Sequence, residues 1–362
     1  MCLRIMKKLH LSFVSIFGFA AALGINFLLV SCNDEFKVTT DWKETAIVVG
    51  VLDPNDTVHY IKITKAFLDE KRNALEIAKI QDSLYFDPTR TVVTVEAWKN
   101  DQKIKTYNPV LDRTIAKDTG IFSAPTQILY KFEQAMTGDF RDKLTEYRLN
   151  IKTPNNNTIT AKTNVVGDYF LLQPPAAAKI DWSNSNVRVR FQRPENATIY
   201  DLKVRIHYQD YAGPGFTNLI ATRFVDWNLV KNAPISLNSS FIDYTFRGVQ
   251  LFAFMRSNIP VLSNLNRRML GTEFIIATGG KDLAQYISIN NSSSNLAQIK
   301  LEYTNINNGL GLFSTRNTIP NLKLEMANRN YPLSSPTYFA PNIITGLDSL
   351  YIKYPELNFL RQ

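Results

Sequence analysis

The stretch VRVRFQRPENATIYDLKVRIHY, residues 187–208, carries the clearest structural pattern in the chain. Apolar and polar side chains alternate in residues 187–191 and again in residues 200–208. Alternation of this kind places one set of side chains on the buried face of an antiparallel sheet and the other set in solvent. The stretch therefore predicts two half-buried antiparallel strands, and an all-β architecture around them.

Shorter runs of the same kind recur in the N-terminal half. Residues 46–52 and 58–64 flank the sequence Asp-Pro-Asn-Asp, which favours a turn and thus a β-hairpin. Apolar side chains in residues 70–84 recur at helical spacing and predict one helix inserted between strands. Short strands separated by turn signals are typical of a β-sandwich. Further strands are expected at residues 91–98, 103–107, 128–132 and 147–151, and after the TPNNN turn that begins at residue 153.

The chain is long enough for two domains, because a single hydrophobic core rarely organises more than about 250–300 residues. The sequence QPPAAAKIDW, residues 173–182, marks a boundary, since its two prolines cannot continue a hydrogen-bonded strand. We expect one β-sandwich over residues 44–172 and a second over residues 178–362. The second includes a helical excursion at about 246–300, because residues 246–259 and 279–293 have helical periodicity on either side of an apolar strand at 273–278.

The N-terminus is typical of a secretory leader. An apolar run over residues 9–30 follows Arg4, Lys7 and Lys8. A membrane-spanning anchor is the alternative, since about 20 apolar residues can cross a bilayer. The sequence Leu-Val-Ser-Cys at residues 29–32 favours the leader, because it resembles the bacterial lipobox, in which the cysteine is acylated and the preceding peptide removed. We expect a signal peptide over residues 1–31, a lipid on Cys32 and a polar tether over residues 32–43.

Removal of the leader changes the composition of the mature chain. Three basic and no acidic side chains leave with it, which lowers the net charge from +9 to +6. Cys32 is then the only cysteine, so the sequence predicts neither a disulfide nor a cysteine metal site. The remaining positive charge is dispersed, without the basic stripe or motif expected of a nucleic-acid-binding protein.

The residues after Cys32 bear on which side of the membrane the protein faces. Asn33, Asp34 and Glu35 resemble the short acidic signal that directs lipoproteins of Bacteroidota to the cell surface. The alternative is that two acidic side chains in a flexible tether are simply solvated. We expect an outer-membrane protein that is lipid-anchored and faces the cell exterior.

No catalytic or metal-binding motif is visible. Of the three histidines, His10 lies in the leader, whereas His59 and His207 stand alone on predicted strands. The alternation places His207 on the solvated face. A Gly-x-Ser-x-Gly motif is absent from the sequence, and no pair of carboxylates is singled out for hydrolysis of a glycoside. We therefore expect a protein that is not an enzyme and holds neither a cofactor nor a metal.

Two tryptophans are candidates for ligand binding. Trp182 and Trp227 each follow an aspartate, and such acid–aromatic neighbours suit stacking against a sugar ring. The alternative for Trp182 is a core position in a β-sandwich. The order of Trp182, a strand, Pro194, Tyr200 and a second strand resembles the B and C strands of a fibronectin type III domain.

Three tripeptides with an Asp, a Ser or Thr and an apolar residue resemble O-glycosylation sites of Bacteroidota. Their acceptor side chains are Thr57, Ser83 and Ser349. Ordinary turn or helix-end chemistry is the alternative explanation for all three.

Three segments together resemble a family of Bacteroidota outer-membrane lipoproteins of unknown function. They are the lipobox, IVVGVLDPNDTVHYIKITKAFL at residues 47–68, and TNINNGLGLFSTR at residues 304–316. The resemblance implies an immunoglobulin-like sandwich and a fibronectin-like second sandwich. It also implies a gene that often lies beside that of a TonB-dependent transporter, and it supplies no catalytic residues. In the last segment, Gly309 and Gly311 predict a backbone with positive φ or a close approach to another backbone segment. Phe313 is predicted to be a core side chain.

These observations favour a non-catalytic outer-membrane lipoprotein that acts as an accessory binding subunit of a β-barrel transporter or another envelope machine. Direct binding of a glycan or nutrient by an aromatic platform is the alternative.

Substitution of Cys32 tests the anchor. We expect Cys32→Ser to abolish incorporation of labelled palmitate and to move the protein from the detergent phase to the aqueous phase, because the acylated thiol is lost. Cys2→Ser, in the leader, is the matched control and should leave both unchanged. Undiminished labelling of the Cys32→Ser protein would contradict the lipobox interpretation.

Overall fold

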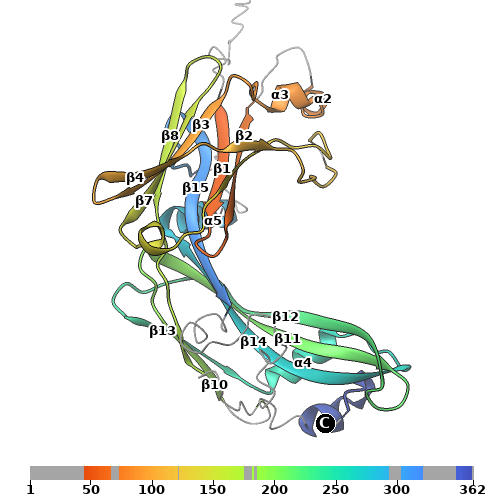
Figure 1. Cartoon of the computed structure of the whole chain (residues 1–362). Helices are drawn as coiled ribbons and strands as arrows, with labels where there is room; N and C mark the ends of the chain where they lie inside the picture. The colour runs from red at the N-terminus through yellow and green to blue at the C-terminus, as the bar shows by residue number, and fades with distance from the viewer. Residues whose placement is uncertain are drawn as a thin grey trace, which may run out of the picture. The chain divides into compact units, whose positions relative to one another are not determined.

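The computed structural model describes residues 45–66, 73–120, 122–174, 182, 186–292, 303–320 and 348–360 (Figure 1). The described residues do not include the predicted signal peptide at 1–31 or the predicted tether at 32–43. The predicted lipidation and export residues, Cys32, Asn33, Asp34 and Glu35, therefore also lie outside them. Within them the chain is mainly β, with antiparallel sheets and few helices, as the sequence predicts.

The largest sheet has eight strands. They are β1 (Ala46–Leu52), β2 (Val58–Lys65), β5 (Val110–Asp112), β6 (Leu129–Glu133), β11 (Ala197–Ala212), β12 (Asn218–Pro234), β14 (Leu265–Gly280) and β15 (Gly309–Pro320). Their order across the sheet is β12-β11-β14-β15-β1-β2-β6-β5.

Two smaller sheets complete the layers. One has the order β4-β3-β7-β8 and consists of β3 (Val92–Lys99), β4 (Gln102–Tyr107), β7 (Thr145–Lys152) and β8 (Thr158–Asn164). The other has the order β13-β10-β9 and consists of β9 (Leu171–Gln173), β10 (Asn186–Gln192) and β13 (Phe241–Arg247). The described helices are α2 (Ala74–Ile77), α3 (Gln81–Leu84), η1 (Gly138–Arg141), α4 (Gln250–Asn258), α5 (Lys281–Ser292), α7 (Asp348–Lys353) and η3 (Pro355–Leu357).

Buried apolar side chains gather into two clusters. The first contains Val48, Val95 and Phe313, and draws on the four-stranded sheet and on the β1 side of the large sheet. The second contains Phe191 and Leu202, and draws on the three-stranded sheet and on the β11 side of the large sheet. Alternating side chains of facing strands fill each cluster, which is the arrangement of a β-sandwich.

Strand β15 belongs to both halves of the large sheet (Figure 1). Residues 309–315 pair in parallel with β1, whereas residues 316–320 pair antiparallel with β14. Residues 44–362 accordingly form one compact unit. The division into domains at residues 44–172 and 178–362 stays a prediction.

Several elements match their sequence signals and others do not. Sequence periodicity correctly places the β1–β2 hairpin, β11, the helices α4 and α5, and the strand between these helices. The expected helix over 70–84 is instead divided into α2 and α3, because Ile80 between them has an extended backbone and is 42% exposed. The sequence did not predict β5, β9, β12 or β13.

Gly311 provides a test of the β1–β15 pairing. Its φ is +113°, and a Cβ added there would lie 2.0 Å from the carbonyl oxygen of Val48. We expect Gly311→Ala to lower the free energy of unfolding by at least about 2 kcal/mol, measured by chemical denaturation, through backbone strain and a steric clash. Gly120 is the control, because a Cβ added at that position would meet no atom within 4 Å, and Gly120→Ala should be nearly neutral. Equal stability of both variants would contradict the close approach.

Candidate functional site

The turn between β1 and β2 is held by its own side chains. Asp53 accepts hydrogen bonds at Oδ1 from the Asn55 backbone N–H (3.0 Å) and at its carbonyl oxygen from the Asp56 N–H (3.0 Å). Its second carboxylate oxygen accepts a hydrogen bond from Arg316 Nε of β15 (3.2 Å). Asp53 is only 3% exposed, so this ion pair fixes the turn against the end of β15.

Asn317 joins this turn to a distant loop. The side chain is fully buried on β15 and donates through Nδ2 to the carbonyl oxygen of Gly167 (2.9 Å) and to Asp168 Oδ1 (3.1 Å). Its Oδ1 accepts a hydrogen bond from Asn55 Nδ2 (2.8 Å). One buried amide therefore connects three segments that are far apart in the sequence.

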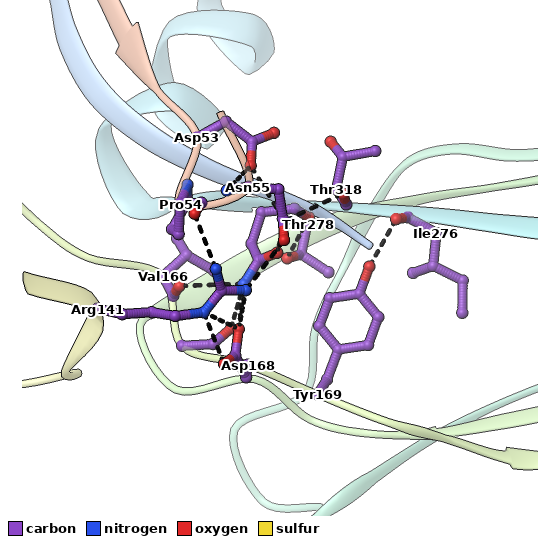
Figure 2. Close-up of polar contacts among 12 residues, drawn as sticks. Asp53, Pro54, Asn55, Arg141, Val166, Asp168, Tyr169, Ile276, Thr278 and Thr318 are labelled. Atoms are coloured by element: carbon purple, nitrogen blue, oxygen red, sulfur yellow. Dashed lines mark hydrogen bonds and ion pairs between the residues drawn. The ribbon is translucent and has the colours of Figure 1, made fainter. Parts of the chain in front are cut away.

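Arg141, at the end of η1, closes the same network from the other side. Its Nε lies 2.8 and 2.7 Å from the two carboxylate oxygens of Asp168, and its Nη1 donates to the carbonyl oxygen of Pro54 (2.8 Å). The Tyr169 hydroxyl donates to the carbonyl oxygen of Ile276 on β14 (2.6 Å), which ties the loop to the second half of the large sheet (Figure 2). The turn is thus held by hydrogen bonds from both η1 and β15.

A cavity of about 490 Å³ is lined by this turn and by strands β11, β12, β14 and β15 of the large sheet. Its charged lining comes from the turn, from β11, β12 and β15, and has both signs. The six charged side chains are Asp53, Asp56, Asp201, Lys203, Lys231 and Arg316. Val230, Ile275 and Ala277 supply apolar surface. Neither histidine nor cysteine is among the described residues that line the cavity.

Some of these charges are already satisfied by the protein. Lys203 Nζ contacts Asp226 Oδ2 (3.0 Å), and Asp201 Oδ1 accepts a hydrogen bond from the Asn232 N–H (2.6 Å). In the described part of the chain Lys231 and Asp56 form no ion pair. A charged ligand in this cavity could therefore pair with Lys231 if it is negative or with Asp56 if it is positive.

Beside the cavity, the outer face of β11 and β12 carries structural ion pairs. The Arg205 guanidinium holds Asp226 through two hydrogen bonds (2.7 and 2.9 Å) and, with Lys203, lowers the pKa of that carboxyl to about 2. Asp226 therefore remains ionised throughout the physiological range. This carboxylate organises the strand face and is not poised to exchange protons near neutrality.

Strand β12 is a long open edge of the large sheet. In the described residues no strand pairs with its outer side. Leu219, Ile220 and Phe224 are 49%, 53% and 57% exposed along it. Edge strands usually avoid association by being short or by carrying lysines. The edges β5 and β9 have three residues each, and the edge strand β4 carries Lys103 and Lys105. The charged side chains of β12, Arg223, Asp226 and Lys231, all follow residue 222, and residues 218–222 carry none.

The two tryptophans of the predicted aromatic platform pack in or against the second apolar cluster. Trp182 is 0% exposed and stacks on Phe274, with ring centroids 6.4 Å apart. Trp227 is half-buried, stacked on Phe254 at 5.6 Å and edge-on to Phe246 at 5.4 Å. Trp182 is thus a core side chain, as its alternative interpretation has it, and presents no ring face to a sugar. Ligand binding by the half-buried Trp227 stays a prediction.

The predicted modification sites and histidines fall in varied environments. Thr57 is exposed next to the β1–β2 turn, Ser83 is half-buried in α3, and Ser349 lies in α7 with its side chain outside the described residues. Burial lowers the pKa of His59, whose Nε2 lies 3.1 Å from the carbonyl oxygen of Gln134. His207 is not solvated as expected, since it contacts Glu273 at 3.3 Å.

Metal centres, membrane spans and known relatives give no further indication of function. The described residues contain no group of three or more His, Cys, Asp or Glu side chains placed to hold a metal ion. None of their helices combines the length and apolarity needed to cross a membrane. Comparison of the chain with models of known protein families gives no match, and comparison with curated proteins gives none either.

Substitution of Asn317 tests the junction that positions the cavity. We expect Asn317→Ala to lower the free energy of unfolding by about 2–4 kcal/mol, because the buried carbonyl oxygens of Val166 and Gly167 lose the hydrogen bonds that the Asn317 amide donates. Asn186→Ala, at an exposed position at the start of β10, is the control and should change stability by less than about 0.5 kcal/mol. Chemical denaturation measures both. Similar values for the two variants would show that the junction does not contribute to stability.

Proposed function

We propose that this protein is a non-catalytic lipoprotein of the outer membrane, anchored through Cys32 and facing the cell exterior. In this proposal it acts as an accessory binding subunit of a β-barrel partner, such as a TonB-dependent transporter or another envelope machine. The lipobox and the acidic residues after it support the anchor and the orientation. The structure of strand β12 supports the contact with a partner.

The open edge of β12 carries this proposal. No strand among the described residues pairs with its outer side, and the apolar side chains of Leu219, Ile220 and Phe224 are exposed along it. Addition of a strand to such an edge is a recurrent mode of protein recognition, in which backbone hydrogen bonds supply affinity and side chains supply specificity. The edge would be an aggregation hazard if it stayed open, so a protein partner is the natural occupant.

The ion pairs of the neighbouring sheet face make Asp226 unsuited to the role of a general acid or base. A general acid or base works best with a pKa near the ambient pH. The pKa of Asp226 is instead held far below that range by Arg205 and Lys203. Binding of a glycan at an aromatic platform has lost its main support with the burial of Trp182.

Co-purification with β12 variants tests the proposal. The full-length protein, tagged after Gln362, is extracted in mild detergent and its partners are identified by mass spectrometry. We expect a stoichiometric β-barrel protein with the unsubstituted chain, and about tenfold less of it with Ile220→Lys or Phe224→Lys, because a lysine at the edge opposes addition of a strand.

Leu75→Lys is the matched control for these variants. Leu75 lies on α2 and is 56% exposed, so the same change of chemistry occurs away from the edge. It should leave the yield of the partner unchanged. Recovery of the lipoprotein without any envelope protein, or equal recovery with all variants, would reject the accessory role of β12.

A further inference from the structure

The polar cavity beside the β1–β2 turn has properties of a ligand site that do not depend on the exposed apolar residues Leu219, Ile220 and Phe224 of β12. Its volume of about 490 Å³ falls within the roughly 300–1,000 Å³ typical of small-molecule sites. Residues from the turn and from β11, β12, β14 and β15 converge on it. We propose that this cavity binds a small zwitterion with an apolar body, namely a short peptide with free amino and carboxyl ends.

Two cations are available for the carboxylate of such a peptide. Arg316 uses its Nε for Asp53, whereas its two terminal nitrogens have no partner within the described residues. Lys231 is exposed on β12 and is likewise without an ion pair there. Because a guanidinium presents its donors in a fixed plane, the Arg316 side chain is suited to a carboxylate, and Lys231 adds a second positive charge.

The Arg316 side chain is also held in position by the protein. Its partner Asp53 is buried and accepts a further hydrogen bond from Asn55 Nδ2 (3.2 Å). Asn55 is in turn held by Asn317. Donors fixed in this way lose little conformational entropy when a ligand binds.

Acceptors for a terminal ammonium group lie in the same cavity. Asp56 is exposed at the turn and forms no ion pair within the described part of the chain. Asp201 on β11 accepts the Asn232 N–H through Oδ1, and its other carboxylate oxygen has no partner among the described residues. The described lining of the cavity therefore includes both negative and positive side chains without an ion-pair partner. This combination favours a zwitterion over a simple anion.

The rest of the lining suits the body of a peptide. Val230, Ile275 and Ala277 are half-buried and form an apolar surface for a side chain. The amide of Asn228 and the hydroxyl of Thr318 can bond to peptide groups. No aromatic ring is among the described lining residues, so the stacking surface on which sugar recognition usually depends is missing.

Calorimetric titration of the full-length protein in detergent tests this site. The probe is alanyl-leucyl-alanine, compared with its C-terminal amide and its N-acetyl form. We expect saturable binding of the free peptide, and binding about tenfold weaker for each blocked form, because one charge-assisted contact is lost in each case.

Two variants assign the ends of the peptide. Lys231→Gln should weaken binding about five- to tenfold and reduce the preference for a free carboxylate, whereas Asp56→Asn should do the same for the free ammonium group. Both side chains are exposed and form no ion pair in the described part of the chain, so the variants should fold normally. Lys79→Gln, at an exposed lysine outside the cavity, is the control and should bind as the unsubstituted protein does.

Absence of peptide binding, or equal binding of the blocked and free forms, would overturn the proposal. Binding of glucuronate without binding of the peptide would also overturn it and indicate an acidic sugar instead. The test is independent of the proposed partner, because Ile220 and Phe224 do not line the cavity. Their lysine variants should bind the peptide normally even where they lose the β-barrel.

Discussion

The two-sided pairing of β15 is the constraint on which the rest of the structure depends. Its first residues add a parallel strand beside β1, and its last residues add an antiparallel strand beside β14. Where the pairing changes, Arg316 and Asn317 meet the β1–β2 turn, and their hydrogen bonds fix that turn. Both apolar clusters and the cavity are therefore positioned by one strand and by the polar side chains at its midpoint.

Local sequence patterns predict the parts of the fold that depend on local interactions. The Asp-Pro-Asn-Asp turn forms because its own side chain and backbone groups bond to one another, and the strict alternation in β11 reflects one buried and one solvated face. Strand β12 has no such alternation, since most of its residues are exposed or half-buried on both faces. Its register comes from its neighbour β11 instead, which a single-strand pattern does not encode.

The cavity could not be predicted for a related reason. Its charged residues are spread from Asp53 to Arg316, and each is unremarkable in its own sequence surroundings. Trp182 and Trp227 attracted attention because an acid precedes each, yet their rings fill a core. In both cases tertiary packing decides whether a polar or aromatic side chain faces solvent. The positive φ predicted at Gly311 is confirmed, because glycine adopts positive φ readily whatever surrounds it in the fold.

The position of Phe313 in the first cluster has a consequence for the order of events during synthesis. The N-terminal half of the chain cannot fill its core until a residue near the other end has been made and delivered. Contacts between residues so distant in sequence form slowly, because a long loop must close first. The first half of the newly made chain thus stays incompletely packed until β15 has been synthesised and has paired with β1.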